Sequence, residues 1–295
     1  MISYGVAVHG GVGSPAEFSD GCRTACEAAL QLLEAGKSAL DAAVEAARVL
    51  EDDGRFNAGS GSVLRIDGKT VEMDAAVMDS EGHIGAVINI RGVKNPVLVA
   101  RAVLGSPHVA MAGRGAQAFA RRLGFGPYYK VSERAAANYE RIKSRMGKED
   151  FHFFRQWVGE QKISGGKGKA KRTDTIGVVA LDKKGVFAVA SSTGGASPML
   201  VGRVGDTPMV GCGFYAGPEG AIAVTGLGEE SIRKMLAKTV YDMVAEGMGA
   251  RASCEKALGL LPQHVDMGII ALAKNDYGAA STRKMPMAQY SAIRP

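Results

Sequence analysis

The junction Arg172-Thr173-Asp174-Thr175 is the place in the chain where residue types point most directly to chemistry. A stretch rich in glycine and lysine ends there, and the apolar run Ile176 to Leu181 begins at once. A threonine hydroxyl is a weak nucleophile, but a threonine at a chain terminus carries an α-amine of pKa about 7.7 to 8, which accepts that proton near neutral pH. Cleavage of the Asp174–Thr175 bond would give one residue both nucleophile and base, with no cofactor for the chemistry. On Thr175 alone, the start of a strand is the better interpretation.

Three glycine-rich motifs place polar side chains at the ends of expected strands, where active sites are often built. They are Ser192-Thr193-Gly194-Gly195, Gly202-Arg203-Val204-Gly205-Asp206 and Thr225-Gly226-Leu227-Gly228-Glu229. The planar guanidinium of Arg203 can bind a carboxylate, and the nearby Asp206 can pair with an ammonium group. Together they predict a site for the two charged ends of an amino acid, with an ordinary surface ion pair as the alternative.

The elements expected before the junction are a strand, two helices, a set of strands and further helices. Apolar residues recur every three to four positions in the helical segments and alternate in the strands. Ser38 is suited to cap the second helix. The expected strands are 6–8, 63–66, 70–78 and 83–91, and the expected helices are 21–36, 39–53, 95–104, 111–123 and 131–146.

The order of strands followed by helices is repeated after the junction. The expected strands are 176–181, 185–192, 209–215, 221–225 and a final one at 267–273, followed by a hairpin turn at 275–278; the expected helices are 229–246 and 252–258. Two sheets packed face to face between helical layers would satisfy both halves, since each sheet then buries one face on the other sheet and one on helices.

Positive charge is concentrated in one segment. Lys and Arg number 36 against 30 Asp and Glu, a net charge of +6, and five of these cations fall between Gln161 and Thr173 without an acidic residue. The linker 160–174 is therefore expected to be mobile and solvated, since it lacks the interleaved aromatic residues of a nucleic-acid platform. A non-enzymatic, basic nucleic-acid-binding protein stays as an alternative, although we do not expect a nucleic-acid partner.

The N-terminal residues predict a cytoplasmic protein. They lack the basic and long apolar regions of a secretory signal, and no run approaches the roughly 18 apolar residues that a membrane span needs. No membrane partner is expected.

Six motifs in this order resemble a known family. They are His9-Gly10-Gly11, Phe56-Asn57-Ala58-Gly59-Ser60-Gly61, the segment Asp174 to Asp182, and the three motifs above. Each is weak alone, but the set covers most of the chain outside the linker. It resembles the plant-type (type 2) asparaginase and isoaspartyl peptidase family of N-terminal nucleophile hydrolases.

The resemblance implies an α+β fold, a four-layer αββα sandwich of two mainly antiparallel sheets between helical layers. It implies that residues 1–295 form a single domain. Self-cleavage would divide this domain into an α subunit, 1–174, and a β subunit, 175–295. It also implies self-association as a dimer of αβ heterodimers.

The same resemblance assigns roles in the reaction. Thr175 would be the nucleophile, and Thr193 would hydrogen-bond to it and tune it. Thr225 and the N–H of Gly226 would stabilise the oxyanion of the tetrahedral intermediate. Asn57 would orient the site beside the new terminus.

The resemblance further implies how substrate and an ion bind. Arg203 would take the substrate α-carboxylate, while Asp206 and the Gly228 backbone would take its α-amino group. A structural sodium ion is implied in the loop around Asn57. Its ligands would be the main-chain carbonyls of Leu50, Glu51, Asp53, Phe56, Ala58 and Ser60.

The implied reaction is attack by Thr175 Oγ on a β-linked carbonyl, that of L-asparagine or of an isoaspartyl dipeptide, followed by hydrolysis of the β-aspartyl ester to aspartate. Two features leave the identity of the leaving group undecided. Ala196-Ser197-Pro198-Met199 stands where the family usually continues with Thr-Asn-Lys, and the Asp174 junction also resembles glycosylasparaginase and threonine aspartase. A glycosylasparaginase-like amidase is the first alternative, although Gly195 departs from that pattern.

Overall fold

The computed structural model describes residues 2–144, 154 and 174–293. The predicted mobility of the linker and the basic run 162–172 fall outside the described residues. The strands are β1 (Ile2–His9), β2 (Met73–Asp79), β3 (Ile84–Ile90), β4 (Ala110–Ala112), β5 (Ile176–Leu181), β6 (Phe187–Thr193), β7 (Phe214–Gly217), β8 (Gly220–Gly226), β9 (Met267–Ala273), β10 (Tyr277–Ser281) and β11 (Met287–Ile293). The helices are α1 (Ser19–Glu34), α2 (Ala39–Asp53), α3 (Pro96–Val103), α4 (Gly113–Arg122), α5 (Glu133–Lys143), α7 (Gly228–Lys234), α8 (Leu236–Ala245) and α9 (Ala250–Leu258).

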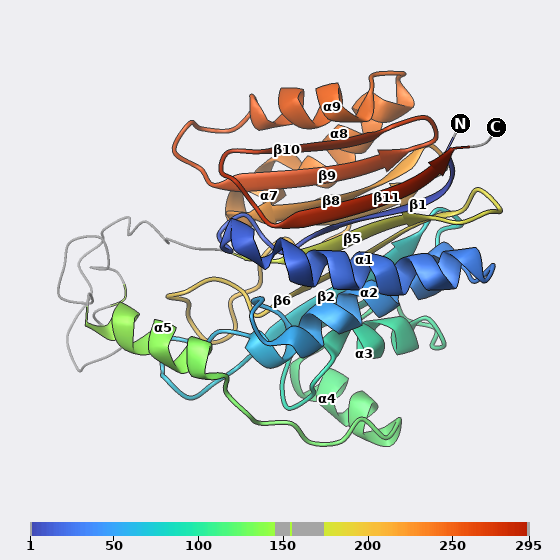
Figure 1. Ribbon diagram of the computed structural model, residues 1–295. Helices are drawn as coiled ribbons and strands as arrows, with labels where there is room; N and C mark the ends of the chain where they lie inside the picture. Colours follow the sequence, from blue (N-terminus) through green and yellow to red (C-terminus); the bar gives the residue numbers. More distant parts are fainter. Residues whose placement is uncertain (1, 145–153, 155–173, 294–295) are drawn as a thin grey trace.

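The strands form two sheets (Figure 1). The larger has seven strands in the order β11-β1-β5-β6-β2-β3-β4, and the smaller has four in the order β10-β9-β8-β7. Neighbouring strands are antiparallel, except that β3 and β4 are parallel. Strands from before and after the Asp174–Thr175 junction are interleaved in the larger sheet: β1 lies between β11 and β5, and β6 pairs with β2.

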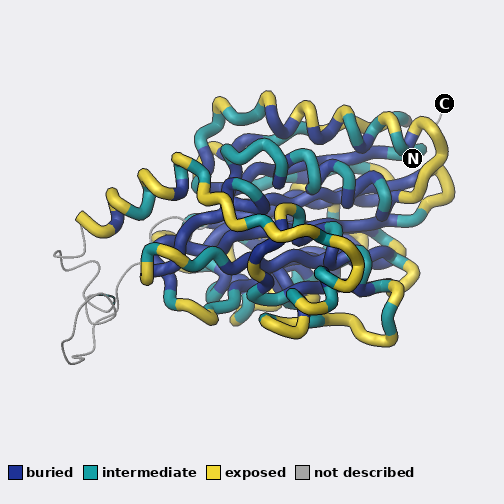
Figure 2. Tube along the Cα trace, turned by 90° about the horizontal axis from the view of Figure 1, so that it is seen from below, coloured by how far each residue is buried: buried dark blue, intermediate teal, exposed yellow. Residues whose placement is uncertain are grey.

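Side-chain alternation gives the apolar core of the described residues three main parts, beside a small cluster of Ile66 and Ile142. In β5, Val179 and Leu181 pack with the smaller sheet, whereas Ile176 and Val178 pack with the helices α1 to α4. The far face of the smaller sheet packs against α8 and α9. Figures 1 and 2 show buried strands at the centre and helices whose outer faces are exposed. The chain thus has a mixed α+β fold with two sheets and helices, as the sequence predicts.

The helix α2 has the predicted bounds, and Ser38 caps it as expected. The Ser38 hydroxyl accepts a hydrogen bond from the N–H of Asp41 at 3.1 Å, and Gly54 ends the helix in the left-handed region with φ 76°. This helix matters for the site because the loop 54–62 follows it directly.

Two predicted strands are wrong in whole or in part. Residues 63–66 form no strand, because their backbone bonds to loops: Arg65 N donates to Thr70 O and Ile66 N to Met199 O. Residues 209–213 belong to turns, and strand β7 starts only at Phe214. Met209 N donates to Asp206 O at 2.9 Å, which closes the first of these turns.

The C-terminal half also differs from the prediction. The single helix expected at 229–246 is two helices, α7 and α8, because Met235 between them adopts a left-handed conformation with φ 44°. The strand 267–273 is not the last, since β10 and β11 follow it. In the described part of the chain, we find no helix with the length and apolar character required to cross a membrane.

Candidate active site

Thr175 lies where the two sheets meet. It stands one residue before β5 of the larger sheet, and its N–H donates to Oγ1 of Thr225, at the end of β8 in the smaller sheet, at 3.2 Å. Its own Oγ1 is 3.4 Å from Oγ1 of Thr207. Only 5% of Thr175 is exposed. Protein groups rather than bulk water therefore surround this hydroxyl.

Two donors converge on the carbonyl oxygen of Asp174, which belongs to the peptide bond before Thr175. The Thr193 hydroxyl donates to it at 2.8 Å, and Nδ2 of Asn57 donates at 2.9 Å. The antiparallel pairing of β5 with β6 brings Thr193, the last residue of β6, beside this junction. In the intact chain, Thr193 thus bonds to the carbonyl rather than to the Thr175 hydroxyl, and its tuning of that hydroxyl stays a prediction.

The loop carrying Asn57 is tied to the loop after Thr193. Asn57 Nδ2 also donates to the Gly195 carbonyl, Gly194 N donates to the Asn57 carbonyl at 2.9 Å, and Asn57 Oδ1 accepts from Val63 N at 3.0 Å. A Cβ at Gly194 would lie 2.5 Å from Asn57 Oδ1, so the two loops require glycine at this contact. These bonds fix the amide of Asn57 toward Asp174.

The glycine turn after β1 packs on the Asp174 side chain. A Cβ at Gly13 would lie 2.5 Å from Asp174 Oδ1, and Gly11 has φ 102°. Val12 N also lies 3.4 Å from Thr225 Oγ1. On the other side, Arg134 of α5 lies 3.7 Å from Asp174 Oδ2. The turn therefore leaves room for the aspartate only because glycine fills these positions.

His9, at the end of β1, is completely buried beside this junction. Burial lowers the pKa of His9 to about 3, and the Thr175 backbone opposes this shift weakly. The imidazole is accordingly neutral at physiological pH.

The predicted substrate-binding residues lie together. A Cβ at Gly228 would be 2.8 Å from Asp206 Oδ1 and 3.1 Å from Nη2 of Arg203. Arg203 forms a two-pronged ion pair with Glu229, in which Nε and Nη2 lie 3.0 and 2.8 Å from the carboxylate oxygens. Asp206 follows Gly205 in a buried loop next to Thr207.

The Asp206 carboxyl is poised to accept a cation. It is buried, and its Oδ2 has no hydrogen-bond partner among the described residues. Burial raises the pKa of Asp206 to about 6, while Ser231 and Arg203 act in the opposite direction. A buried carboxylate oxygen without a donor is a suitable place for a substrate ammonium group.

Thr225 and Gly226 end strand β8 against β9. Gly226 has φ 140°, and a Cβ there would overlap the carbonyl oxygen of Asp266. The Thr225 hydroxyl accepts from two backbone N–H groups, those of Val12 and Thr175. The positions are compatible with the oxyanion role predicted for this pair, which stays a prediction.

The loop predicted to hold sodium joins the last turn of α2 to a tight turn at Gly59–Gly61. Ser60 Oγ donates to the Glu51 carbonyl at 2.6 Å, and a Cβ at Gly61 would overlap the carbonyl oxygens of Phe56 and Gly54. Main-chain carbonyls from a helix C-terminus and a loop thus converge here. Such oxygens carry partial negative charge and suit a hard cation.

A buried ion pair supports the segment 196–199 that departs from the family pattern. Arg65, fully buried, lies 3.0 Å from Glu72 and contacts the sulfur of Met199 at 2.9 Å. Glu72 also accepts from Gly202 N at 2.7 Å. The pair therefore joins the loop after Thr193 to the loop that carries Arg203.

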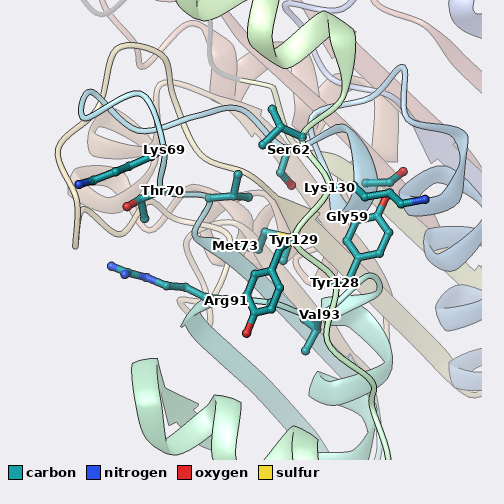
Figure 3. A pocket seen from close by; sticks show the side chains of 14 residues that line it. Gly59, Ser62, Lys69, Thr70, Met73, Arg91, Val93, Tyr128, Tyr129 and Lys130 are labelled. Carbon is teal, nitrogen blue, oxygen red and sulfur yellow. The ribbon is translucent and has the colours of Figure 1, made fainter.

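Two pockets border the Asn57 loop. One of about 250 Å³ is lined by Asn57, Asp174 and Ser197 together with residues of α5. The other, about 190 Å³, lies at Gly59 and Ser60 and is rimmed by cationic and aromatic side chains (Figure 3). The first pocket is the one beside the junction.

Sequence reasoning missed two residues of this site, Thr207 and Glu229. Both immediately follow or end motifs that were singled out, but nothing in the sequence shows which side chains they contact. The residues predicted for catalysis and for substrate binding are otherwise brought to one place by the ends of β5, β6 and β8.

Comparison with known proteins shows the family to which the chain belongs. A family model described as asparaginase matches residues 4–293. The chain belongs to the asparaginase family. This asparaginase-family chain is 41% identical over 291 residues to the plant-type L-asparaginase of Pyrococcus abyssi, covering 95% of this chain and 93% of that protein. It is similar to the isoaspartyl peptidase/L-asparaginase of Rattus norvegicus, with 40% identity over 258 residues, 83% of this chain and 72% of that protein. The family resemblance predicted from the six motifs is confirmed.

Proposed function

We propose that this asparaginase-family chain is an autoprocessed threonine hydrolase that cleaves β-aspartyl amide bonds. Its substrates are L-asparagine and isoaspartyl dipeptides, and its common product is aspartate. The names of the relatives, L-asparaginase and isoaspartyl peptidase/L-asparaginase, support the substrate class. The observation that carries the mechanism is the pair of donors, Thr193 and Asn57, on the carbonyl oxygen before Thr175.

Self-cleavage would begin at that carbonyl. Thr175 Oγ attacks the carbonyl carbon of Asp174, and negative charge develops on the oxygen that Thr193 and Asn57 already bind. The C–N bond breaks, the hydroxyl proton goes to the leaving nitrogen, and an ester links Asp174 to Thr175. The α-amine of Thr175 is free from this point. Water then hydrolyses the ester, which releases the carboxylate of Asp174 and restores the hydroxyl of Thr175.

The liberated α-amine then acts as the base for the same hydroxyl. Thr175 Oγ attacks the β-carbonyl of the substrate, and Thr225 with the Gly226 N–H stabilises the oxyanion. The leaving group, ammonia or an amine, departs with the proton that the α-amine of Thr175 had taken up. Water hydrolyses the β-aspartyl ester and releases aspartate.

Substrate binding uses Arg203, Asp206 and the backbone of Gly228, which we call the Asp206 clamp. Asp206 Oδ2, without a donor in the described structure, binds the α-ammonium group together with the Gly228 backbone. Arg203 binds the α-carboxylate, although Glu229 already occupies two of its N–H directions. Binding at Arg203 therefore requires its remaining Nη1 edge or a shift of Glu229.

The loop around Asn57 fits the proposed structural sodium ion. The carbonyls of Leu50, Glu51 and Asp53 come from the last turn of α2, where helical carbonyls lack intrahelical donors, and those of Phe56, Ala58 and Ser60 come from the loop. A bound sodium ion would supply charge neutralisation and rigidity. Asn57, in the middle of this loop, would be held toward Asp174.

The proposed architecture is the four-layer αββα sandwich, within which the two sheets share one core. It is supported by the cluster that joins Val179 and Phe187 of the larger sheet to Phe214 and Ile270 of the smaller. The proposed assembly is a dimer of αβ heterodimers.

The decisive experiment compares the wild type with Thr175→Ala on a denaturing gel and in three assays. The wild type should separate into fragments 1–174 and 175–295, while the variant stays intact. Purified, cleaved protein is then tested for ammonia release from L-asparagine, leucine release from β-aspartyl-leucine and sugar release from the glycosylated amino acid. Sugar release alone would replace the proposal with a glycosylasparaginase. An intact wild type that is inactive in all three assays would refute the proposal.

A further inference from the structure

The hydrogen-bond partner of the Thr175 hydroxyl is a residue that the six motifs do not single out. Within the described part of the chain, Oγ1 of Thr175 lies 3.4 Å from Oγ1 of Thr207. Thr193, the residue expected in this place, directs its hydroxyl to the Asp174 carbonyl instead. We infer that Thr207 is a positioning residue for the nucleophile, an inference that rests on the proposed role of Thr175.

Burial makes this contact consequential. Thr207 is 1% exposed and Thr175 is 5% exposed, so neither hydroxyl can readily exchange its partner for bulk water. Buried hydroxyls lose free energy when they lack a hydrogen bond, which favours the rotamers in which the two oxygens meet. The contact thereby limits the directions in which Oγ of Thr175 can point.

The backbone around Thr207 is held firmly. The Asp206 carbonyl accepts from Met209 N at 2.9 Å and from Gly213 N at 3.2 Å. A Cβ at Gly213 would lie 2.9 Å from the Cα of Thr207, so this turn is packed against the start of β7 without space to move. A hydroxyl fixed by such a turn is a fixed reference point for Thr175.

The chemistry gives Thr207 the donor role. The proton of Thr175 must be directed to its base, and one lone pair must face the carbonyl carbon under attack. A hydrogen bond donated by Thr207 uses another lone pair of Oγ and leaves both of these directions available. No proton is transferred from Thr207, which supplies orientation only, both in self-cleavage and in substrate turnover.

The position of Thr207 also connects recognition with attack. Asp206, which binds the substrate ammonium group in the proposed function, is its direct neighbour in the chain. One peptide unit therefore sets the spacing between the recognised end of the substrate and the nucleophile. A fixed spacing would suit a β-aspartyl hydrolase, because the attacked carbonyl of its substrate is a fixed number of bonds from the α-amino group.

The test compares Thr207→Val, which keeps the shape and removes the hydroxyl, with Thr207→Ser, which keeps the hydroxyl. Ser253→Ala is the matched control, since Ser253 is also buried but donates to the O of Gly249, the residue before α9. The rate at which the two fragments appear is measured on denaturing gels. The kcat and KM for L-asparagine are measured separately and normalised to the cleaved fraction.

Thr207→Val should lower both the cleavage rate and kcat at least about tenfold, with KM within about twofold of the wild type. Thr207→Ser and Ser253→Ala should stay within about threefold of the wild type in all three quantities. A loss in Thr207→Ser with wild-type rates in Thr207→Val would show that packing of the methyl group matters instead. Equal losses in both variants would show that the hydroxyl alone does not determine the rates, which would also overturn the inference. A change in KM alone would assign Thr207 to the Asp206 clamp, and wild-type behaviour of Thr207→Val would likewise overturn the inference.

Circular dichroism distinguishes these outcomes from misfolding. If Thr207→Val does not fold, Thr207→Ala and Thr207→Ser provide the same comparison of absent and present hydroxyl. A wild type that is neither cleaved nor active would refute the proposed function and this inference together. An active, cleaved wild type with an unaffected Thr207→Val would refute this inference alone.

Discussion

The hydroxyl of Thr193 and the side-chain amide of Asn57 are directed at one oxygen atom, that of the Asp174 carbonyl. They come from different parts of the sequence and meet only because β6 lies beside β5 and the Asn57 loop packs on Gly194. Two donors are already in place before any charge develops on this oxygen. The proposed self-cleavage therefore requires little rearrangement of polar groups around the carbonyl.

The first prediction concerns the hydroxyl of Thr193. Thr193→Val should slow the appearance of the two fragments about 100-fold to 1,000-fold, because it removes one donor to the developing oxyanion. The measurement is the cleaved fraction of freshly purified protein over time on a denaturing gel. Thr239→Val is the control, since the Thr239 hydroxyl bonds to Lys234 O on an exposed part of the chain. Cleavage of Thr193→Val at the wild-type rate would contradict the role of this donor.

The second prediction follows from the raised pKa of Asp206, about 6. The ionised carboxylate binds the substrate ammonium group, so KM should be constant above pH 6 and rise about tenfold per pH unit below it. Asp206→Asn should raise KM and remove this pH dependence, which steady-state kinetics between pH 5 and pH 8 would measure. An Asp206→Asn variant with unchanged KM would exclude Asp206 from the clamp.

The same carboxyl has a defined effect on stability. Its pKa in the folded state lies above its ordinary value of 3.8. Its favourable contribution to the free energy of unfolding is therefore complete below pH 3.8 and is lost as the pH rises through about 6. Asp206→Asn should accordingly not lower the free energy of unfolding at pH 7.5, as denaturant titration can verify. This result would separate a substrate-binding role from a structural one.

The sequence predicts site residues that belong to a motif, but it does not predict residues whose role depends on contacts between the two sheets. Thr175, Asn57 and Asp206 were named from the sequence, although their roles stay predictions. Thr207 and Glu229 were not assigned roles, because their partners Thr175 and Arg203 lie on other elements. A periodic pattern indicates which face of a strand is buried, but it does not indicate which hydroxyl of one sheet meets which hydroxyl of the other.

At the scale of elements, the turn between β1 and α1 determines the space available to the cleavage junction. Gly13→Ala should slow self-cleavage at least about tenfold, because the added Cβ would lie 2.5 Å from Asp174 Oδ1 and displace the aspartate. Gly115→Ala is the matched control, since a Cβ at Gly115 meets nothing within 4 Å. Both variants are compared by the time course of fragment formation. Equal rates in the two variants would show that this turn does not constrain the junction.

The prediction of elements succeeded where local signals agreed with packing. Helix α2 has the predicted bounds because an apolar face, Ser38 at its start and Gly54 after its end all favour the same segment. The expected helix 229–246 is interrupted at Met235, whose left-handed conformation no local signal indicates. Residues 63–66 look like a strand because three of the four are apolar, yet they are buried in a loop that bonds to other loops.

At the scale of the whole molecule, cleavage of the Asp174–Thr175 bond should not separate the two fragments. In the larger sheet, β1 pairs with β11 on one side and β5 on the other, and β2 pairs with β6. Both fragments thus contribute interleaved strands to one hydrogen-bonded sheet with a common apolar core. The cleaved protein should elute as one species in size-exclusion chromatography and separate only in denaturant. Two separate peaks without denaturant would contradict this prediction.

The pairing of the first and last strands has another consequence. Ile2 lies opposite Ile293 in the β1–β11 ladder, so the first and last described residues of the chain are neighbours (Figure 1). A short linker joining them would permit a circular permutant whose new first residue is Thr175 and whose last is Asp174. Removal of the initiating methionine would then expose the threonine amine directly. Such a permuted polypeptide would carry a free N-terminal threonine without cleavage of its own backbone.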